Sequence, residues 1–233
     1  IIAAKARYQG QMQTYKDFSE KMDLSFESRQ DNLRNVLDKM QQIGIDAAEL
    51  EVHQEYDLNV DKLKEQEEKK IEAGDIEQSE KKESWSTSDE AYYYYLDETT
   101  QGLPVFSKRS VNDYSGDERS QIIVCAGNDG IRYLYMKWFF LFDIGDDKVK
   151  FAPIDNIKEC IKRKYGKTLD ENCITVKKMV LGVYPLATDK EKNAVVPVWI
   201  CFLERKTKGS EYVEKLYVPI NAITGEEFYD MEG

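Results

Sequence analysis

The spacing of apolar residues predicts two helices, each with a single apolar face. Ser28 can cap the first helix, and Gly44 can end it in a left-handed conformation. Between them, apolar side chains recur at helical spacing at Leu33, Val36, Leu37, Met40 and Ile43. Pro153 suits the first turn of the second helix, and Gly166 closes it. Its apolar stripe consists of Ile154, Ile157, Ile161 and Tyr165.

Alternation with a period of two predicts that most of the remaining chain forms strands. The expected strands are residues 22–26, 50–60, 91–96, 103–108, 121–125, 131–142, 174–186, 195–206 and 212–223. In residues 50–60 the apolar side chains are expected on one side, with Gln54 as the gap, and a helix is the competing prediction. Gly127–Gly130 predicts a hairpin turn between the fifth and sixth of these strands.

The expected return strand, residues 131–142, is apolar on both faces. A strand covered on one side only would alternate between apolar and polar residues. We therefore expect its second face to be covered, either by the first half of the chain or by a partner.

Together these elements predict an α+β fold with antiparallel sheets and helices packed on one face. We expect two domains, divided near residue 90. Residues 1–89 form a helix and strand subdomain with a charged excursion at 61–89, where Glu65 and Lys69 can pair on a solvated helix. Residues 90–233 form the second domain. The same order of helix and strands in both halves leaves a diverged tandem repeat as an alternative.

Composition narrows the classes of function. The formal net charge of −11 disfavours nucleic acid, because binding of phosphates requires a basic surface. No apolar run is long enough to cross a bilayer. The chain begins at Ile1 without a methionine, so we expect a processed or truncated form that a signal peptide or a lipid-attachment cysteine preceded.

Candidate metal ligands are few. The four cysteines form no C-x-x-C pair and the chain has one histidine, so we expect no zinc site and no cofactor. Buried free thiols are the main expectation, and a Cys160–Cys173 disulfide is the alternative. Asp143, Asp146 and Asp147 crowd one loop but lack the spacing of a calcium loop, which favours an acidic turn.

No residue set predicts catalysis. A nucleophile activated by histidine would have to use His53, which we expect to be exposed on the polar side of its strand. Glycine-rich nucleotide loops are absent. An extracellular hydrolase that uses acidic residues is the alternative to a non-enzymatic protein, although no carboxylate pair is distinguished.

Several segments resemble an exported, usually lipid-anchored protein family of unknown function from Clostridia and related Firmicutes, over about residues 90 to 228. The matching pieces are 90–94 (EAYYY), 101–105 (QGLPV), 128–131 (NDGI), 151–157 (FAPIDNI), 179–184 (MVLGVY), 196–199 (VPVW) and 220–225 (INAITG). The C-terminal helix and three strands resemble a PepSY module, in which Asp is more frequent at the position of Asn221. Similar layouts occur in the extracytoplasmic Yyc-type regulators of a cell-wall sensor kinase.

This resemblance implies an extracytoplasmic protein, anchored by lipid to the cell membrane. We expect a non-enzymatic binding or regulatory module at the cell surface, with an envelope protein or peptide as its partner. We expect the candidate binding surface to combine aromatic residues of the return strand with an exposed strand near Pro197. Because proline cannot donate to a strand ladder, that strand is expected to be an edge or to carry a bulge at this residue. The candidate residues are Tyr133, Tyr135, Trp138, Pro197 and Trp199. The alternatives are that the return strand packs the two subdomains together and that Trp199 belongs to a core.

Overall fold

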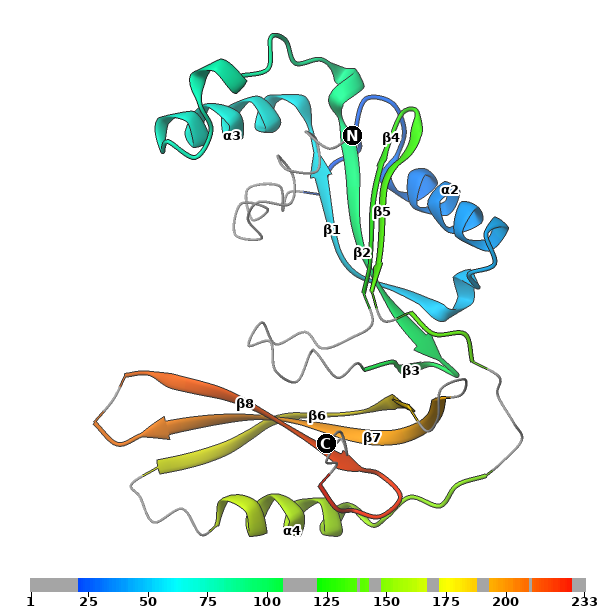
Figure 1. Ribbon diagram of the computed structural model, residues 1–233, viewed down its shortest axis with the longest axis vertical. Coiled ribbons are helices and arrows are strands. Elements are labelled where there is room, and N and C mark those ends of the chain that lie inside the picture. Colours follow the sequence, from blue (N-terminus) through cyan, green and yellow to red (C-terminus); the bar gives the residue numbers. More distant parts are fainter. Residues whose placement is uncertain are drawn as a thin grey trace. The chain divides into compact units, whose positions relative to one another are not determined.

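A computed structural model of the chain describes residues 21–106, 121–137, 139–142, 148–166, 172–187, 193–209 and 211–227. It contains two compact units, Ile1–Asp97 with Gln121–Phe139, and Glu98–Ser120 with Phe140–Gly233. The first unit contains an antiparallel sheet with α2 (Arg29–Gln42) and α3 (Val60–Glu72), and the second contains an antiparallel sheet with α4 (Ile154–Tyr165), which confirms the predicted α+β class (Figure 1). The boundary expected near residue 90 does not coincide with this division, because β2 (Ala91–Thr100) pairs with β4 (Gln121–Gly127) inside the first unit.

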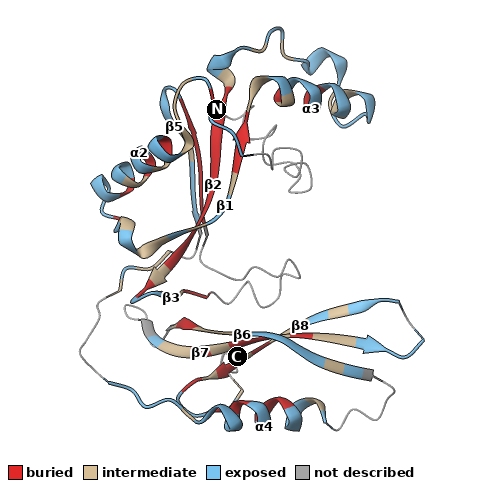
Figure 2. Ribbon diagram, turned by 180° about the vertical axis from the view of Figure 1, so that it is seen from behind, coloured by how far each residue is buried: buried red, intermediate tan, exposed pale blue. Residues whose placement is uncertain are grey.

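The first unit is built on a sheet of strand order β1-β2-β4-β5. β1 is Leu50–Leu58 and β5 is Gly130–Lys137, while the two-residue β3 (Leu103–Pro104) pairs with the end of β2. β2 lies inside the sheet and is buried on both faces (Figure 2). This explains its continuous apolar and aromatic sequence, which is typical of a strand covered on both sides.

Helix α2 (Arg29–Gln42) covers one face of this sheet. Ser28 is its N-cap and accepts a hydrogen bond from the backbone N–H of Asp31 at 3.2 Å, as the sequence predicted. Gly44 follows the helix with φ of 90°. Val36 and Met40 are buried against β2 and β4, so the predicted amphipathic helix is confirmed.

Helix α3 (Val60–Glu72) packs on the opposite face, where Leu63 joins a core with Tyr93 and Tyr95. The prediction of helices on one face is therefore wrong for this unit. The physical reason is that β2 presents tyrosines in both directions, so each face needs a cover. Lys69 Nζ lies 2.7 Å from Glu65 Oε1, as expected for a helical pair at this spacing.

β1 is a strand, but its apolar side chains do not share one side. Leu50 and Val52 pack in the core beneath α2, whereas Tyr56 and Leu58 pack in the core on the α3 face. The alternation reverses between Val52 and Tyr56, as a local irregularity in a strand produces. The expectation of a single apolar side is therefore wrong.

Three other predicted strands differ from the structure. Residues 22–26 form no strand, and the segment 103–108 contributes only β3 and single bridges at 105–106 within the described residues. β5 ends at Lys137, so the return strand is shorter than the predicted 131–142. Short 3-10 helices occur at Ala47–Glu49, Gln78–Glu80 and Thr87–Asp89.

The second unit combines helix α4 (Ile154–Tyr165) with a three-stranded sheet of order β6-β7-β8. The strands are β6 (Asn172–Ala187), β7 (Asn193–Thr207) and β8 (Val213–Asn221), all antiparallel. Ile157 and Ile161 of α4 pack on Leu203 and Val218. The predicted helix and meander of this unit are thus present, with α4 on one face of the sheet.

Pro197 lies in the central strand β7, and the pairing of β6 with β7 has no register shift at this residue, so the expectation of an edge strand or a bulge is wrong. The proline is tolerated because it lies one residue beyond the last pair of β7 with β8, Val198 with Asn221. Its carbonyl accepts the backbone N–H of Ala222 at 2.9 Å. The N–H that proline lacks therefore faces the side where β8 has already ended.

Candidate functional site

The two edges of the first sheet differ in character. β1 carries the exposed Glu51 and the half-buried Glu55, and charge on an edge strand discourages pairing with other chains. β5 instead exposes apolar side chains. The exposed fractions are 36% for Ile131, 36% for Leu134, 38% for Tyr135 and 38% for Met136.

The edges of the second sheet each carry a feature that discourages pairing. Val105 bridges Val183 of β6, and Phe106 donates its backbone N–H to the carbonyl of Val183 at 2.9 Å. β8 contains Pro219 and is bridged at Ile220 by Glu227. β5 differs from these edges. Among the strands in the described part of the chain, it lies at the end of its sheet, has no strand paired on its outer side, and is neither rich in acidic residues nor interrupted by proline.

The exposed side chains of β5 point to both faces of the sheet. Its register pairs Val124 with Leu134 and Ile122 with Met136, which places Leu134 and Met136 on the α2 face. Tyr135 pairs with Ile123 and lies on the opposite face. Because α2 covers β2 and β4, an apolar surface of β5 continues past the edge of the helix.

A groove of about 740 Å³ runs between α2 and the β4–β5 hairpin. Its apolar lining includes Phe26, Val36, Ala126, Ile131 and Leu134. This volume lies in the range of ordinary ligand-binding pockets. An unpaired strand edge and an apolar groove therefore adjoin at the same strand.

Two tyrosines of β2 fix the N-terminal end of α2. The Tyr92 hydroxyl accepts the backbone N–H of Leu24 and donates to the carbonyl of Glu27, both at 2.7 Å. The Tyr94 hydroxyl lies 3.1 Å from Asn32 Oδ1 and 3.2 Å from the carbonyl of Arg29. Burial raises the pKa of Tyr92 to about 12 and also raises the pKa of Tyr94, so both hydroxyls remain protonated at neutral pH. The groove wall formed by α2 is held to the sheet before any ligand arrives.

Arg132 fixes the other wall, the β4–β5 hairpin. Its guanidinium donates to the carbonyls of Ser88 at 2.7 Å and Glu90 at 3.0 Å. It also lies 2.6 Å from Asp129 Oδ1, and this hydrogen bond holds the pKa of Asp129 below its ordinary value. The planar fork of arginine suits such multiple contacts.

The residues predicted for binding have different environments. Tyr135 is exposed on β5, but Tyr133 is partly buried and packs against the core of the α3 face. Trp138 lies outside the described residues. Pro197 and Trp199 belong to the second unit, where Trp199 packs against the core beneath α4.

Sequence reasoning missed the contribution of α2 to the groove and the importance of Leu134 and Met136. The signal for the two β5 residues was present, because the strand is apolar on both faces. The polar groove residues of α2 carry no such signal, since they look like any solvated helical face.

His53 is exposed, as expected, and its Nδ1 lies 3.5 Å from Oδ2 of the buried Asp97. Among the described residues, no cluster of histidine, cysteine and carboxylate groups could hold a metal ion. Asp143, Asp146 and Asp147 lie outside those residues. No helix in the described ranges is long and apolar enough to span a bilayer.

All four cysteines are free thiols, so the alternative Cys160–Cys173 disulfide is not formed. Cys125, Cys160 and Cys201 are buried, and Cys173 is exposed. Burial raises the pKa of Cys125 and that of Cys201 to about 12. Such thiols behave as small apolar residues of a core rather than as nucleophiles.

Comparisons with known proteins give no assignment. No family model matches the chain. No curated protein matches it either. A crystal structure of an uncharacterized protein from Eubacterium rectale is similar, with 16% sequence identity and a TM-score of 0.48. The match covers 92% of this chain and 59% of that protein, so the chain spans about three fifths of its length.

Proposed function

We propose that this chain is a non-enzymatic binding or regulatory module that takes up an extended peptide segment of a partner at the outer edge of β5. The observation that carries the proposal is the exposure of apolar side chains on both faces of β5, at the end of a sheet. Other sheet edges in the described part of the chain are charged, bridged or interrupted by proline.

Strand addition would satisfy the backbone of both chains. An edge strand presents unpaired N–H and C=O groups that another extended segment can match. Side chains of the added strand would alternate between the two faces of the sheet, so every second one would contact the groove beside α2. The main-chain hydrogen bonds would supply affinity, and the groove would supply selectivity.

We also propose that the module acts outside the cytoplasm, tethered to the membrane by lipid. This part rests on the resemblance of residues 90–228 to exported Firmicutes proteins. Its partner would then be an envelope protein or peptide. The sequence of the precursor tests this location, and a precursor without a signal peptide or a lipid-attachment cysteine would contradict it.

The binding proposal is tested with two matched variants. Leu134→Lys puts a charge on the β5 edge at a side chain that is 36% exposed. Val213→Lys makes the same change at a 38% exposed position of the edge strand β8 in the other unit. A library of extended peptides, immobilised on an array, is probed with the wild type and both variants.

We expect Leu134→Lys to abolish binding and Val213→Lys to retain it, with melting temperatures of both variants within a few degrees of wild type. Absence of any peptide ligand, or equal binding by both variants, would contradict the proposal. The alternative of an extracellular hydrolase using acidic residues predicts turnover of peptides or glycans, which the wild-type protein is expected not to show.

A further inference from the structure

We infer that the segment bound at β5 is basic as well as apolar, with lysine or arginine flanking its apolar side chains on the face that meets the groove. This inference rests on the proposed function and adds the chemistry of the ligand. It is drawn from the charges around the groove, which are independent of the exposed edge.

The floor of the groove is apolar. Val36 of α2 and Ala126 of β4 are buried, at 2% and 1% exposure, and Ile131 and Leu134 complete the side formed by β5. Side chains that enter this space from an added strand would therefore gain most by being aliphatic. Successive side chains on one face of a strand are about 7 Å apart, so only alternate residues meet this floor.

The rim of the groove has an excess of negative charge. Three carboxylates line it, Glu27, Asp38 and Asp129, against a single ammonium group, Lys39. Lys39 Nζ lies 3.2 Å from Gln42 Oε1, and Asp129 is paired with Arg132. Because the rim remains acidic after these contacts are counted, it attracts a cationic segment and repels an anionic one.

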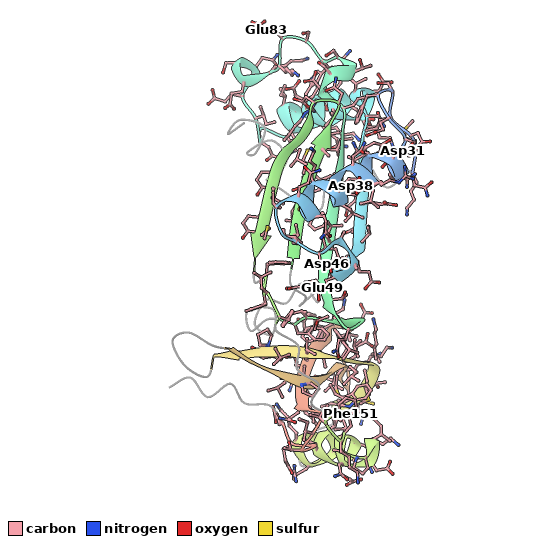
Figure 3. All side chains as sticks on the ribbon, turned by 90° about the vertical axis from the view of Figure 1, so that its right-hand side faces the viewer. Asp31, Asp38, Asp46, Glu49, Glu83 and Phe151 are labelled. Atoms are coloured by element: carbon pink, nitrogen blue, oxygen red, sulfur yellow. The ribbon has the colours of Figure 1, made fainter. Side chains whose placement is uncertain are left out.

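Asp38 is the rim carboxylate best placed to meet a ligand. It is exposed on α2, whereas the carboxylate of Glu27 accepts the amide groups of Asn32 at 3.0 Å and Asn35 at 2.6 Å. Figure 3 views this side of the unit, with α2 in front of the sheet and Asp31 and Asp38 labelled on the helix. An ammonium or guanidinium group on the added strand can approach Asp38 from solvent without displacing a core contact.

The remainder of the first unit strengthens this preference. Most of the formal net charge of −11 falls in residues 1–97 and 121–139. The positive charge of Arg132 on β5 is already paired with Asp129 and does not offset this negative charge. A second copy of β5 would therefore bring two whole acidic units together, and this argues for a basic peptide in place of a self-associated dimer.

The test uses three synthetic peptides, each of the length of β5, with valine at the central positions that face the groove and lysine, serine or glutamate at the flanking positions on the same face. Binding is measured by isothermal titration calorimetry at low and at physiological salt. We expect the valine–lysine peptide to bind about tenfold more tightly than the valine–glutamate peptide at low salt, with a smaller ratio at higher salt because exposed charges are screened.

Asp38→Asn should weaken the valine–lysine peptide by about threefold and leave the valine–serine peptide unchanged, which corresponds to the loss of one exposed ion pair. Asp75→Asn is the control, because it removes the same charge at an exposed position outside the groove. Equal affinities for the lysine and glutamate peptides, or equal effects of the two variants, would overturn the basic ligand while leaving strand addition intact.

Two further outcomes separate the inference from the function on which it rests. If none of the three peptides and no library peptide binds, the proposed function fails. If the free protein sediments as a dimer that Leu134→Lys converts to a monomer, a second copy of this chain occupies β5 and the peptide ligand is overturned.

Discussion

The side chain of Arg132 occupies the space that a Cβ atom on residue 127 would need. A methyl group on Gly127 would collide with the Cζ, Nη2 and Nε atoms of the Arg132 guanidinium. The hairpin can therefore be fastened to residues 88–90 only while residue 127 has no side chain. Glycine at this position lets the guanidinium approach the backbone closely, which is a general use of glycine in strands.

This relationship predicts a coupled pair of substitutions. Gly127→Ala should destabilise the protein by about 1–2 kcal/mol, because Arg132 must leave the carbonyls of Ser88 and Glu90. In an Arg132→Ala background the same change should cost about zero, since no guanidinium remains to be displaced. Urea unfolding of the four proteins measures the coupling energy, and an equal cost in both backgrounds would contradict it.

Gly182 of β6 occupies a comparable position in the second unit. A Cβ there would collide with the Phe106 ring and would lie 2.5 Å from the backbone carbonyl oxygen of Pro104. Because a backbone atom cannot rotate away, Gly182→Ala should destabilise the protein by about 2–3 kcal/mol.

The same variant should release residues 105–106 from the β6 edge, which hydrogen exchange at the Phe106 amide can detect. Ala126→Gly, which removes a methyl from a buried strand position in the other unit, should leave this exchange unchanged. If the Phe106 amide of Gly182→Ala exchanged at the wild-type rate, residues 105–106 would not cover the β6 edge in this way.

Glu55 and Asp57 of β1 are expected to give opposite pH dependences of stability. Burial opposes ionisation of Glu55, but hydrogen bonds from Lys21 and Arg29 outweigh it and hold the pKa of Glu55 below its ordinary value. Its contribution is present above the ordinary glutamate pKa and is lost as the pH falls through the lowered value. Glu55→Gln should therefore cost about 1 kcal/mol near neutral pH and progressively less in acid.

For Asp57 the sign is reversed. Burial raises the pKa of Asp57 despite its hydrogen bond from the Met22 N–H and the nearby Arg29. The folded state then binds the proton more tightly than the unfolded state, so the contribution of Asp57 becomes less favourable as the pH rises through the raised pKa. Asp57→Asn should gain stability relative to wild type from acid to neutral pH. If the difference in stability between each variant and the wild type did not change with pH, both assignments would be contradicted.

Thiol labelling should distinguish Cys173 from the other three cysteines. Cys173 is exposed, whereas Cys125, Cys160 and Cys201 are buried. A maleimide should modify Cys173 alone in the native protein and all four residues after denaturation, as measured by peptide mass spectrometry. If Cys173, like Cys160, were protected from labelling before reduction and lost this protection after it, a disulfide would be indicated and the structure contradicted.

The sequence predicted an element correctly where the spacing of its apolar residues agreed with the residues that begin and end it. Ser28 and Gly44 bound α2, and Pro153 and Gly166 bound α4, because helix caps depend only on neighbouring residues. Gly44 takes the left-handed conformation with φ of 90°, whereas Gly166 has φ of −70°. The hairpin at residues 127–130 was predictable for the same reason. The predicted strand 131–142 is also apolar on both faces in the sequence, and it includes most of β5, the edge strand of the candidate site.

The sequence by itself thus determined the α+β class, the two amphipathic helices and the meander of β6, β7 and β8. Only the tertiary structure decided that α2 and α3 take opposite faces, that β5 is an edge, and that Pro197 lies in a central strand where β8 has ended. The physical reason is that the alternation of apolar and polar residues shows how many faces of a strand are apolar, but it does not show which segment covers each face. That choice depends on pairing between residues far apart in the chain, such as β2 with β4.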